Sequence, residues 1–246
     1  MEIFAGTRCG QKHAENEDHY GHWQIDDDRL VLAVADGIGS NTYGGSVARW
    51  LIANVPAHAT DGSLLNILQR LHSEIRSEFD DIQEFLTSGA SIAFALVTGN
   101  TAHILWAGDS PVFHTRADGQ CTRLTVPHSS SLDVLDNWFS GARKLEPDET
   151  TVKLASNDVL TLCSDGAILD EPSLGTAVQN EVLSQTHIDS LLDDSVVAFD
   201  SDDATIVCYR HRHDNDELRP LRSDRIVRNV NAPVVTLYDD KYFSIR

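Results

Sequence analysis

Three apolar segments of the sequence end in the same way, with a small residue followed by an aspartate. They are VLAVADG at Asp36, HILWAGDS at Asp109 and VLTLCSDG at Asp165. A fourth segment, SDDATIVCYR, is reversed, so that Asp202 and Asp203 precede its apolar run. If that strand runs antiparallel to the others, all four loops deliver carboxylates to one end of the sheets.

A fifth acidic stretch, ENEDHYGHW, carries Glu15, Glu17 and Asp18 and leads into a further expected strand. Asp-Gly is a common turn pair, and Asp118-Gly119 is interpreted only as a turn. A turn does not explain why aspartates recur at several strand ends. Carboxylates gathered at one point repel each other unless cations hold them together. Carboxylates, a glycine carbonyl and water are hard oxygen ligands, which predicts Mg²⁺ or Mn²⁺ rather than zinc.

The glycine-rich loop after Asp36 raises the question of a nucleotide phosphate site. Gly39 and Gly44 have nearly the spacing of a P-loop, but Gly45 stands where the lysine should be. Asp36 would also repel a phosphate without a cation between them. Thr42 occupies the third glycine position of a dinucleotide fingerprint. The sequence therefore argues against both nucleotide motifs.

Bulk composition narrows the partners and the compartment. The 246 residues carry a formal net charge of -19, which would repel nucleic acid over most of the surface. The four cysteines are scattered without a C-x-x-C pair, as is typical of thiols in a reducing cytosol. The N-terminus lacks a signal sequence, and no apolar run reaches the length of a membrane helix. We expect a cytoplasmic protein that binds neither nucleic acid nor membrane.

Hydrophobic periodicity predicts the elements that position these residues. An amphipathic helix is expected from about Gly62 to Leu86, and a shorter one from Gly45 to Val55, ending before Pro56. The strand signals are RLVLAVA, SIAFALV, AHILWAG, PVFHT, TTVKLA, DVLTLCS and ATIVCYR. Several are apolar almost throughout, which indicates sheets covered on both faces. Tight turns, among them Asn157-Asp158, indicate antiparallel pairing. The pattern predicts an α+β fold with helices covering stacked antiparallel sheets.

The character of the chain changes after Arg210. The following HRHDNDELRPLRSDRIVRNV is polar, dense in charges of both signs and poor in core residues. We interpret residues 1–210 as one domain and 211–246 as a polar tail. The tail could be regulatory, or APVVTLYDD could add an edge strand.

Six short motifs fall in a fixed order along the chain. They are NED at 16–18, ADGIGS at 35–40, SGAS at 88–91, AGDS at 107–110, CSDG at 163–166 and DDAT at 202–205. Together they resemble the metal-dependent serine/threonine protein phosphatases of the protein phosphatase 2C type, also called the PPM family, in a compact bacterial-like form. The resemblance covers roughly Gly6 to Arg210 and makes 1–210 the catalytic domain. It implies an αββα sandwich of two antiparallel sheets flanked by helices, with a binuclear metal centre at one end.

The resemblance also implies roles for seven residues that would surround two Mn²⁺ or Mg²⁺ ions: Glu17, Asp18, Asp36, Gly37, Asp109, Asp165 and Asp202. Asp36 would bridge the ions, with Asp18 and the Gly37 carbonyl on one of them. Asp165 and Asp202 would hold the other ion, and Glu17 would act through a metal-bound water. Asp109 with Asp165 could hold a weaker third ion. Asp36, Asp165 and Asp202 would be catalytic through a bridging water that attacks the phosphoester in line.

Two positions near the motifs depart from the family pattern. His13 stands where the family usually has an arginine, which makes His13 the candidate phosphate ligand, with Arg8 and Lys12 as possible substitutes. Ile38 stands where some members have a histidine that protonates the leaving alkoxide. The general acid is therefore unassigned.

Later departures concern the surroundings of the site. His128 lies in LTVPHSSS and is expected to be a structural loop residue, and Asp203 replaces a common asparagine. Only about 20 residues separate His128 from the strand near Thr150, so the family's flap is much reduced. We expect a more open metal site and altered substrate selection.

The leading hypothesis is a phosphoserine/phosphothreonine protein phosphatase that acts as a monomer and reverses a cognate Ser/Thr kinase. The alternative is a pseudophosphatase, a module that binds phosphoprotein with little turnover, which the histidine at position 13 would favour. A structural calcium-binding protein is disfavoured because no loop has EF-hand spacing.

Overall fold

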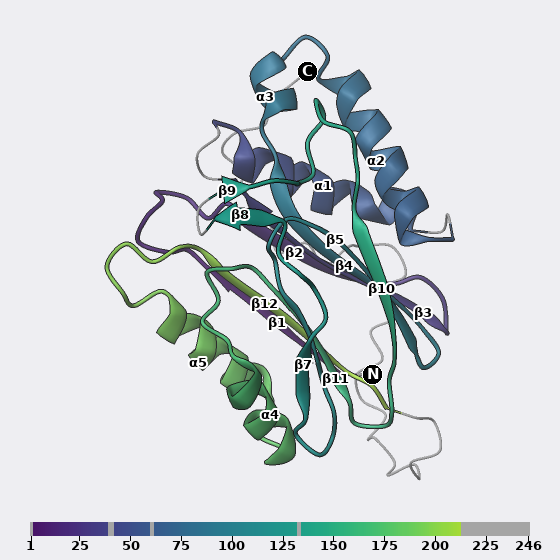
Figure 1. The fold of residues 1–246 in the computed structure, drawn as a ribbon, viewed down its shortest axis with the longest axis vertical. Helices are drawn as coiled ribbons and strands as arrows, with labels where there is room; N and C mark the ends of the chain where they lie inside the picture. The colour runs from purple at the N-terminus through teal and green to yellow at the C-terminus, as the bar shows by residue number, and fades with distance from the viewer. Residues whose placement is uncertain (1, 39–41, 60–61, 132–133, 213–246) are drawn as a thin grey trace, which may run out of the picture.

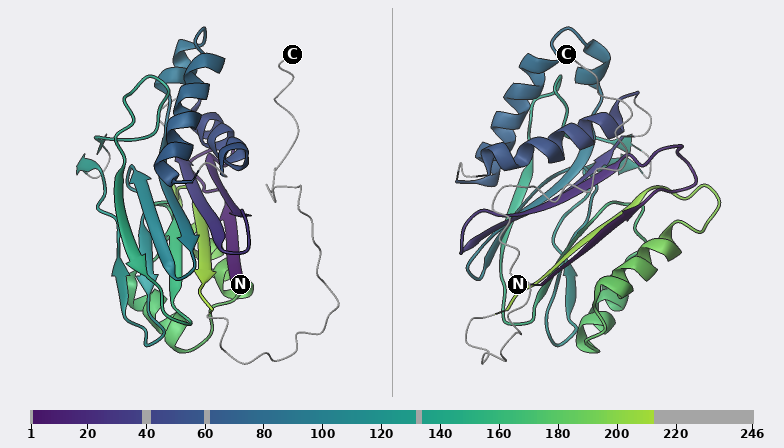
Figure 2. Two further views of the ribbon diagram at one scale, coloured as in Figure 1. Left: turned by 90° about the vertical axis from the view of Figure 1, so that its right-hand side faces the viewer. Right: turned by 180° about the vertical axis from the view of Figure 1, so that it is seen from behind.

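Two five-stranded antiparallel sheets stack face to face and carry helices on their outer faces (Figures 1 and 2). The computed structural model describes residues 2–38, 42–59, 62–131 and 134–212. The first sheet has the order β1 (Glu2–Arg8), β12 (Ala204–Arg210), β11 (Val159–Cys163), β6 (Val112–Thr115) and β7 (Cys121–Arg123). The second has the order β10 (Asp148–Lys153), β5 (Thr101–Ala107), β4 (Ala90–Thr98), β3 (Arg29–Gly37) and β2 (Asp18–Gln24).

The helices form the two outer layers (Figure 2). The second sheet is covered by α1 (Gly44–His58), α2 (Leu64–Glu78) and the short α3 (Gln83–Thr87). The first sheet is covered by α4 (Glu171–Gln179) and α5 (Gln185–Ser195). A small hairpin of β8 (Ser129–Ser131) and β9 (Val134–Leu135) lies apart from both sheets. The expected α+β fold, an αββα sandwich, is confirmed.

The alternation of side chains along β3 explains its uninterrupted apolar sequence. Val31, Ala33 and Ala35 pack under the α1–α2 layer, whereas Leu32 and Val34 face the other sheet. All five are fully buried. A strand covered on both faces needs apolar residues at every position, and the sequence supplies them up to the point where Asp36 begins the acidic end.

Two helix predictions were wrong in their limits. α1 continues through Pro56 to His58, because a proline in the last turn removes a single helical hydrogen bond while Ile52 and Val55 stay buried. The helix expected over 62–86 is broken between α2 and α3. There the rings of Phe79 and Phe85 stack with centroids 4.0 Å apart. In a continuous helix, residues six apart are separated by about 9 Å along the axis.

One turn prediction was also wrong. Asn157-Asp158 lies between β10 and β11, which belong to different sheets, so it carries the chain across the sandwich rather than closing a hairpin. Asp118-Gly119 does close the β6–β7 hairpin, with Gly119 at a φ of +88°. The residues of the expected tail from 213 onward, including the possible edge strand APVVTLYDD, lie outside the described residues.

Two helices that the sequence analysis did not anticipate begin at readable caps. The Asp170 carboxylate accepts a hydrogen bond from the Ser173 N–H at the start of α4, and the Ser184 hydroxyl accepts one from the His187 N–H at the start of α5. Within the described ranges, none of the helices combines the length and hydrophobicity that crossing a bilayer requires.

Candidate metal and phosphate site

The second sheet brings three of the expected acids to one end. Asp18 at the start of β2 lies directly opposite Asp36 near the end of β3, and Asp36 in turn is opposite Ser91 of β4. The Ser91 hydroxyl accepts hydrogen bonds from the backbone N–H groups of Asp109 and Ser110, at 3.0 Å each. One serine therefore fixes the turn that carries Asp109 beside the strand that carries Asp36.

The first sheet delivers the remaining acids from the facing layer. Asp165 follows β11, and Asp202 precedes its antiparallel neighbour β12. A Cβ added to Gly166 would lie 2.1 Å from the Asp203 carbonyl oxygen, so the two loops touch at a position that only glycine fits. The side chains of Asp165 and Asp202 also interact electrostatically.

Ser164 joins the two layers at this point. Its hydroxyl donates to Asp18 Oδ2 at 2.6 Å and accepts from the Thr205 N–H at 2.9 Å. Ser164 directly follows β11 of the first sheet, Asp18 begins β2 of the second, and both are buried. The sequence analysis used the CSDG motif for its aspartate alone and missed this serine. A polar residue directly after a buried apolar strand was the available signal.

Burial and mutual repulsion raise the pKa values of these acids. Burial raises the pKa of Asp36 well above its ordinary value, and the charges of Asp18, Asp165 and Asp109 raise it further. Burial and the charge of Asp109 raise the pKa of Asp165 as well. Burial likewise raises the pKa of Asp18 and Glu17. The acids lie close enough that their charges oppose each other.

Two oxygens of the group fit a cation in particular. Asp18 Oδ1 and Glu17 Oε2 are buried and accept no hydrogen bond from any described residue. An unpartnered buried carboxylate oxygen is costly, and a divalent ion would remove that cost. The donor set consists of oxygens alone, which suits Mg²⁺ or Mn²⁺. In the described part of the chain, no three His, Cys, Asp or Glu side chains form a ready metal-binding group, so metal binding would require these carboxylates to turn toward a common point.

Gly37 also lies in a tight backbone contact of the site. A Cβ at this position would lie 2.4 Å from the backbone nitrogen of Gly45 at the start of α1, so no larger residue fits. The Gly37 N–H donates to the Glu17 carbonyl at 3.2 Å. These contacts pack the start of α1, the end of β3 and the Glu17 loop together.

Three basic residues precede the NED motif, and two of them face the acids. His13 Nε2 lies 3.5 Å from Asp202 Oδ1, and its Nδ1 lies 3.9 Å from Glu17 Oε2. The Lys12 ammonium donates to Asp202 Oδ2 at 2.8 Å. Arg8 instead points to α5, where its guanidinium contacts Asp193 at 2.7 Å and Asp189 at 3.5 Å.

Asp203 has a structural task that the sequence did not reveal. Its Oδ1 accepts the Gly10 N–H at 2.8 Å and its Oδ2 accepts the Glu17 N–H at 2.7 Å. It is only 4% exposed. A buried carboxylate with two backbone donors is well satisfied, and here it ties both ends of the loop before Asp18 to the start of β12.

His128 lies in the flap and contacts the turn before Asp109, as expected of a structural loop residue. Its Nδ1 accepts the Gly108 N–H at 3.2 Å, its Nε2 lies 3.2 Å from Asp148 Oδ2, and its ring stacks on Trp106. These contacts attach the short flap to the second sheet.

Comparisons with known proteins agree with this arrangement. The family model described as Protein phosphatase 2C matches residues 5–205. Protein phosphatase PhpP of Streptococcus pneumoniae is 23% identical over 194 residues, which span 68% of this chain and 78% of PhpP.

Solved structures share the fold at low sequence identity. The serine/threonine phosphatase Stp1 from Staphylococcus aureus has a TM-score of 0.76 at 18% identity and is aligned over 86% of this chain and 95% of its own. The Mycobacterium tuberculosis serine/threonine phosphatase PstP/Ppp has a TM-score of 0.72 at 22% identity, over 86% and 99% of the two chains. The fold, the order of the motifs and a family match over most of the sequence lead to one conclusion: the chain belongs to the protein phosphatase 2C family.

Proposed function

We propose that the protein hydrolyses phosphoserine and phosphothreonine in proteins, as a metal-dependent phosphatase. The observation that carries the proposal is the approach of acids from two sheets: Asp18 and Asp36 from one, Asp165 and Asp202 from the other. A fold gains no stability from such a cluster, since like charges in a buried site repel each other. Bound divalent cations would offset this repulsion, so metal binding explains why the acids are placed together.

The seven expected ligands keep their proposed roles. Asp36 would bridge two Mn²⁺ or Mg²⁺ ions, Asp18 and the Gly37 carbonyl would hold one, and Asp165 and Asp202 the other. Glu17 would act through bound water, and Asp109 with Asp165 would hold a weaker third ion. When bound, such ions supply a nucleophilic water at neutral pH and positive charge for the phosphoryl oxygens. Ser164 and Asp203 keep Asp18 and the Glu17 backbone in place for this task.

The thiols offer a poor alternative to an activated water. Burial raises the pKa of Cys163 and of Cys208, so neither forms a thiolate readily, and both are enclosed between sheet and helices. Burial also raises the pKa of Cys9 and of Cys121. A cysteine-based phosphatase mechanism needs a thiol whose pKa is lowered.

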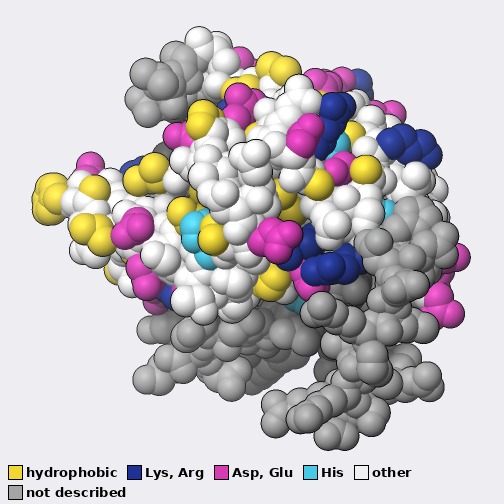
Figure 3. Space-filling view, turned by 90° about the horizontal axis from the view of Figure 1, so that it is seen from below, with side chains coloured by type: hydrophobic (Ala, Val, Ile, Leu, Met, Phe, Trp, Pro, Cys, Tyr) yellow, Lys and Arg dark blue, Asp and Glu magenta, His cyan; other side chains and the backbone are white. Residues whose placement is uncertain are grey.

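The partners that we propose are a phosphorylated protein substrate and the Ser/Thr kinase that produces it, with the phosphatase acting as a monomer in the cytoplasm. Nucleic acid is a poor candidate on charge. On the face seen in Figure 3, Lys and Arg side chains of the described residues are interspersed with Asp and Glu. Nucleic acid binding requires a continuous basic surface instead.

The test is a Mn²⁺-dependent assay on p-nitrophenyl phosphate and on a phosphothreonine peptide. Asp36→Asn and Asp202→Asn should each lower kcat at least about a hundredfold, because each removes a metal ligand without changing side-chain volume. Asp27→Asn is the matched control, because Asp27 is exposed in the β2–β3 turn region and should leave activity unchanged. Circular dichroism would verify that all variants fold.

The two functional readings predict different results in this assay. Metal-dependent turnover by the wild type that both site variants abolish would support the phosphatase. A folded wild type that binds phosphopeptide without turnover would support the pseudophosphatase, which no observation on the described residues favours.

A further inference from the structure

We propose that Lys12, rather than His13, is the principal residue that binds the phosphate of the substrate. The inference rests on the proposed function and deepens it, because it concerns how a site without the usual arginine holds its substrate. Three basic side chains are available near the NED motif, and their contacts distinguish them.

Arg8 is excluded by its partners. Its guanidinium is engaged by Asp193 and Asp189 of α5, on the outer layer of the first sheet. Arg8 pairs with two carboxylates there, so reaching the acidic end would break both contacts. Its role is to fasten α5 to the end of β1.

His13 has the right position but is a poor anion ligand. Its two ring nitrogens face two carboxylates, Asp202 at 3.5 Å and Glu17 at 3.9 Å. Each ring nitrogen serves one partner at a time, so turning His13 toward a phosphate would cost it one of these two carboxylate contacts. Its position between Asp202 and Glu17 therefore favours a role in orienting these two carboxylates over a role in binding the phosphate of the substrate.

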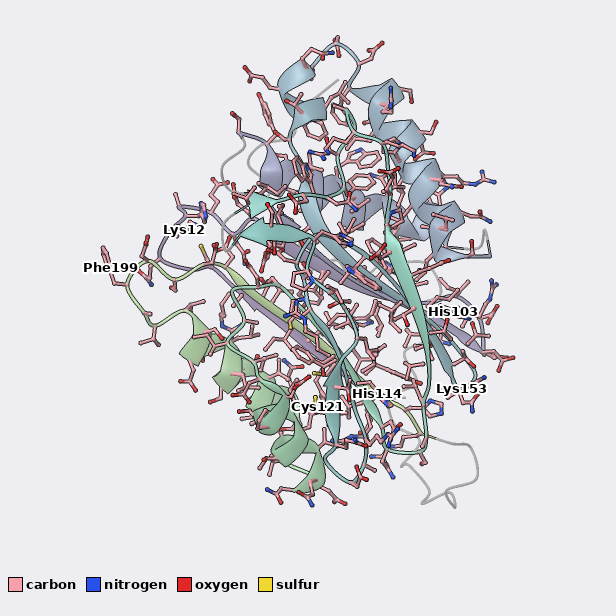
Figure 4. The ribbon with its side chains drawn as sticks, viewed as in Figure 1. Lys12, His103, His114, Cys121, Lys153 and Phe199 are labelled. Carbon is pink, nitrogen blue, oxygen red and sulfur yellow. The ribbon has the colours of Figure 1, made fainter. Side chains whose placement is uncertain are left out.

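Lys12 carries a permanent charge at the rim of the acids. Its ammonium lies 2.8 Å from Asp202 Oδ2, and its side chain is 49% exposed, so a substrate can reach it. Figure 4 shows Lys12 on the loop after β1, on the opposite side of the molecule from Lys153. An ammonium has three donors and pairs with phosphate as a point charge. Once Asp202 is committed to metal, the Lys12 ammonium needs another anionic partner, and a phosphoryl group is the anion that the reaction brings.

The backbone beneath Lys12 is fixed. The N–H groups of Gln11 and Lys12 both donate to the Ser201 carbonyl, at 2.9 and 3.0 Å. Gly10 is held by Asp203, and a Cβ at Gly10 would lie 2.3 Å from the Asp202 carbonyl oxygen. The loop that bears Lys12 therefore packs directly on the segment that bears Asp202. Only the side chain needs to rotate for the ammonium to pass from carboxylate to phosphate.

The experiment compares Lys12→Ala, Lys12→Arg, His13→Ala and the remote control Lys153→Ala in the full chain. Three quantities are measured: KM and kcat for a phosphothreonine peptide with Mn²⁺, the affinity of the Mn²⁺-loaded protein for inorganic phosphate by calorimetry, and the affinity for Mn²⁺ alone. Lys12→Ala should raise KM and weaken phosphate binding about tenfold, as expected for one charge-assisted hydrogen bond. The affinity for Mn²⁺ should stay the same or rise, because the ammonium no longer competes for Asp202.

Lys12→Arg should restore phosphate binding, since the charge is kept, and Lys153→Ala should match the wild type in every measurement. A smaller effect of His13→Ala on phosphate binding than of Lys12→Ala would support the assignment. If Lys12→Ala leaves phosphate affinity within about twofold of the wild type, Lys12 only neutralises Asp202 and the inference is overturned. An equal or larger loss in His13→Ala overturns it as well. Failure of the wild type to turn over peptide would instead refute the proposed function, while the phosphate calorimetry still tests Lys12.

Discussion

The interface between the two sheets consists of closely packed apolar side chains, whereas the acidic end of the same sheets brings together side chains that repel each other. In the interface, Leu32 and Val34 of β3 pack against the facing sheet with no exposed surface, which stabilises the fold. Two residues beyond Val34 on the same strand, Asp36 lies among other acids that raise its pKa. The strand thus passes within a few residues from a region optimised for packing to one that is held together in spite of its charges. Functional sites are where such local conflict is expected.

The largest stability effect should come from the interface. Leu32→Ala removes a fully buried side chain between the sheets and should lower the free energy of unfolding by about 2–5 kcal/mol, through lost burial and a cavity. Urea unfolding followed by fluorescence measures this. Val197→Ala is the control, because Val197 is 77% exposed and should change stability by less than about 0.5 kcal/mol. Equal losses in both variants would contradict the packing assigned to β3.

At the acidic end, metal binding should raise the stability of the protein. Mn²⁺ at a hundred times its Kd should stabilise the wild type by about 2.7 kcal/mol, because the ion binds the folded state and relieves the repulsion among the acids. Thermal unfolding with and without EDTA measures the change in Tm. Asp202→Asn should lose most of this stabilisation. A wild-type Tm that does not depend on Mn²⁺ would remove the physical reason for the acidic cluster.

Ser164 connects the two regions, and its removal should have a smaller effect. Ser164→Ala leaves Asp18 Oδ2 without its buried donor and should destabilise the protein by about 1–3 kcal/mol. It should also weaken Mn²⁺ binding, because Asp18 would lose its orientation. Calorimetry and urea unfolding measure the two effects, with Ser77→Ala on the exposed face of α2 as the control. If Ser164→Ala lowers stability but leaves the Mn²⁺ affinity unchanged, Ser164 contributes to the packing of the fold and not to the metal site.

The sequence was most informative for strands that are buried on both faces, because nearly every residue of such a strand is apolar. The apolar runs of β3, β4 and β5 predicted buried strands, and the recurring aspartate at strand ends predicted that the acids converge. Each apolar run and each strand-end aspartate can be recognised from a short stretch of sequence. Because the same pattern occurs several times, it indicates a shared site more strongly than any single occurrence. The family resemblance then assigned a role to each acid.

The rest depends on residues that are distant in the sequence. Arg8 meets its partners on α5, 181 and 185 positions along the chain, and periodicity gives no sign of that contact. Asp203 was noted from the sequence only as a replacement for a common asparagine, because its partners Gly10 and Glu17 lie in a loop nearly the whole domain away. The break after α2 and the crossing after β10 are likewise set by packing between layers, which local propensity cannot report.

Asp202 and Asp203 are adjacent in sequence yet face opposite ways, one toward the Lys12 ammonium and one into backbone donors. Inserting or deleting one residue just before β12 would exchange these two directions, sending the anchoring carboxylate outward and the exposed one into the interior. We therefore expect the length of the α5–β12 connection to be strictly limited in functional variants, and the same should hold for the segment between β9 and β10, where Phe139 is fully buried and exchanges backbone hydrogen bonds with Ala90.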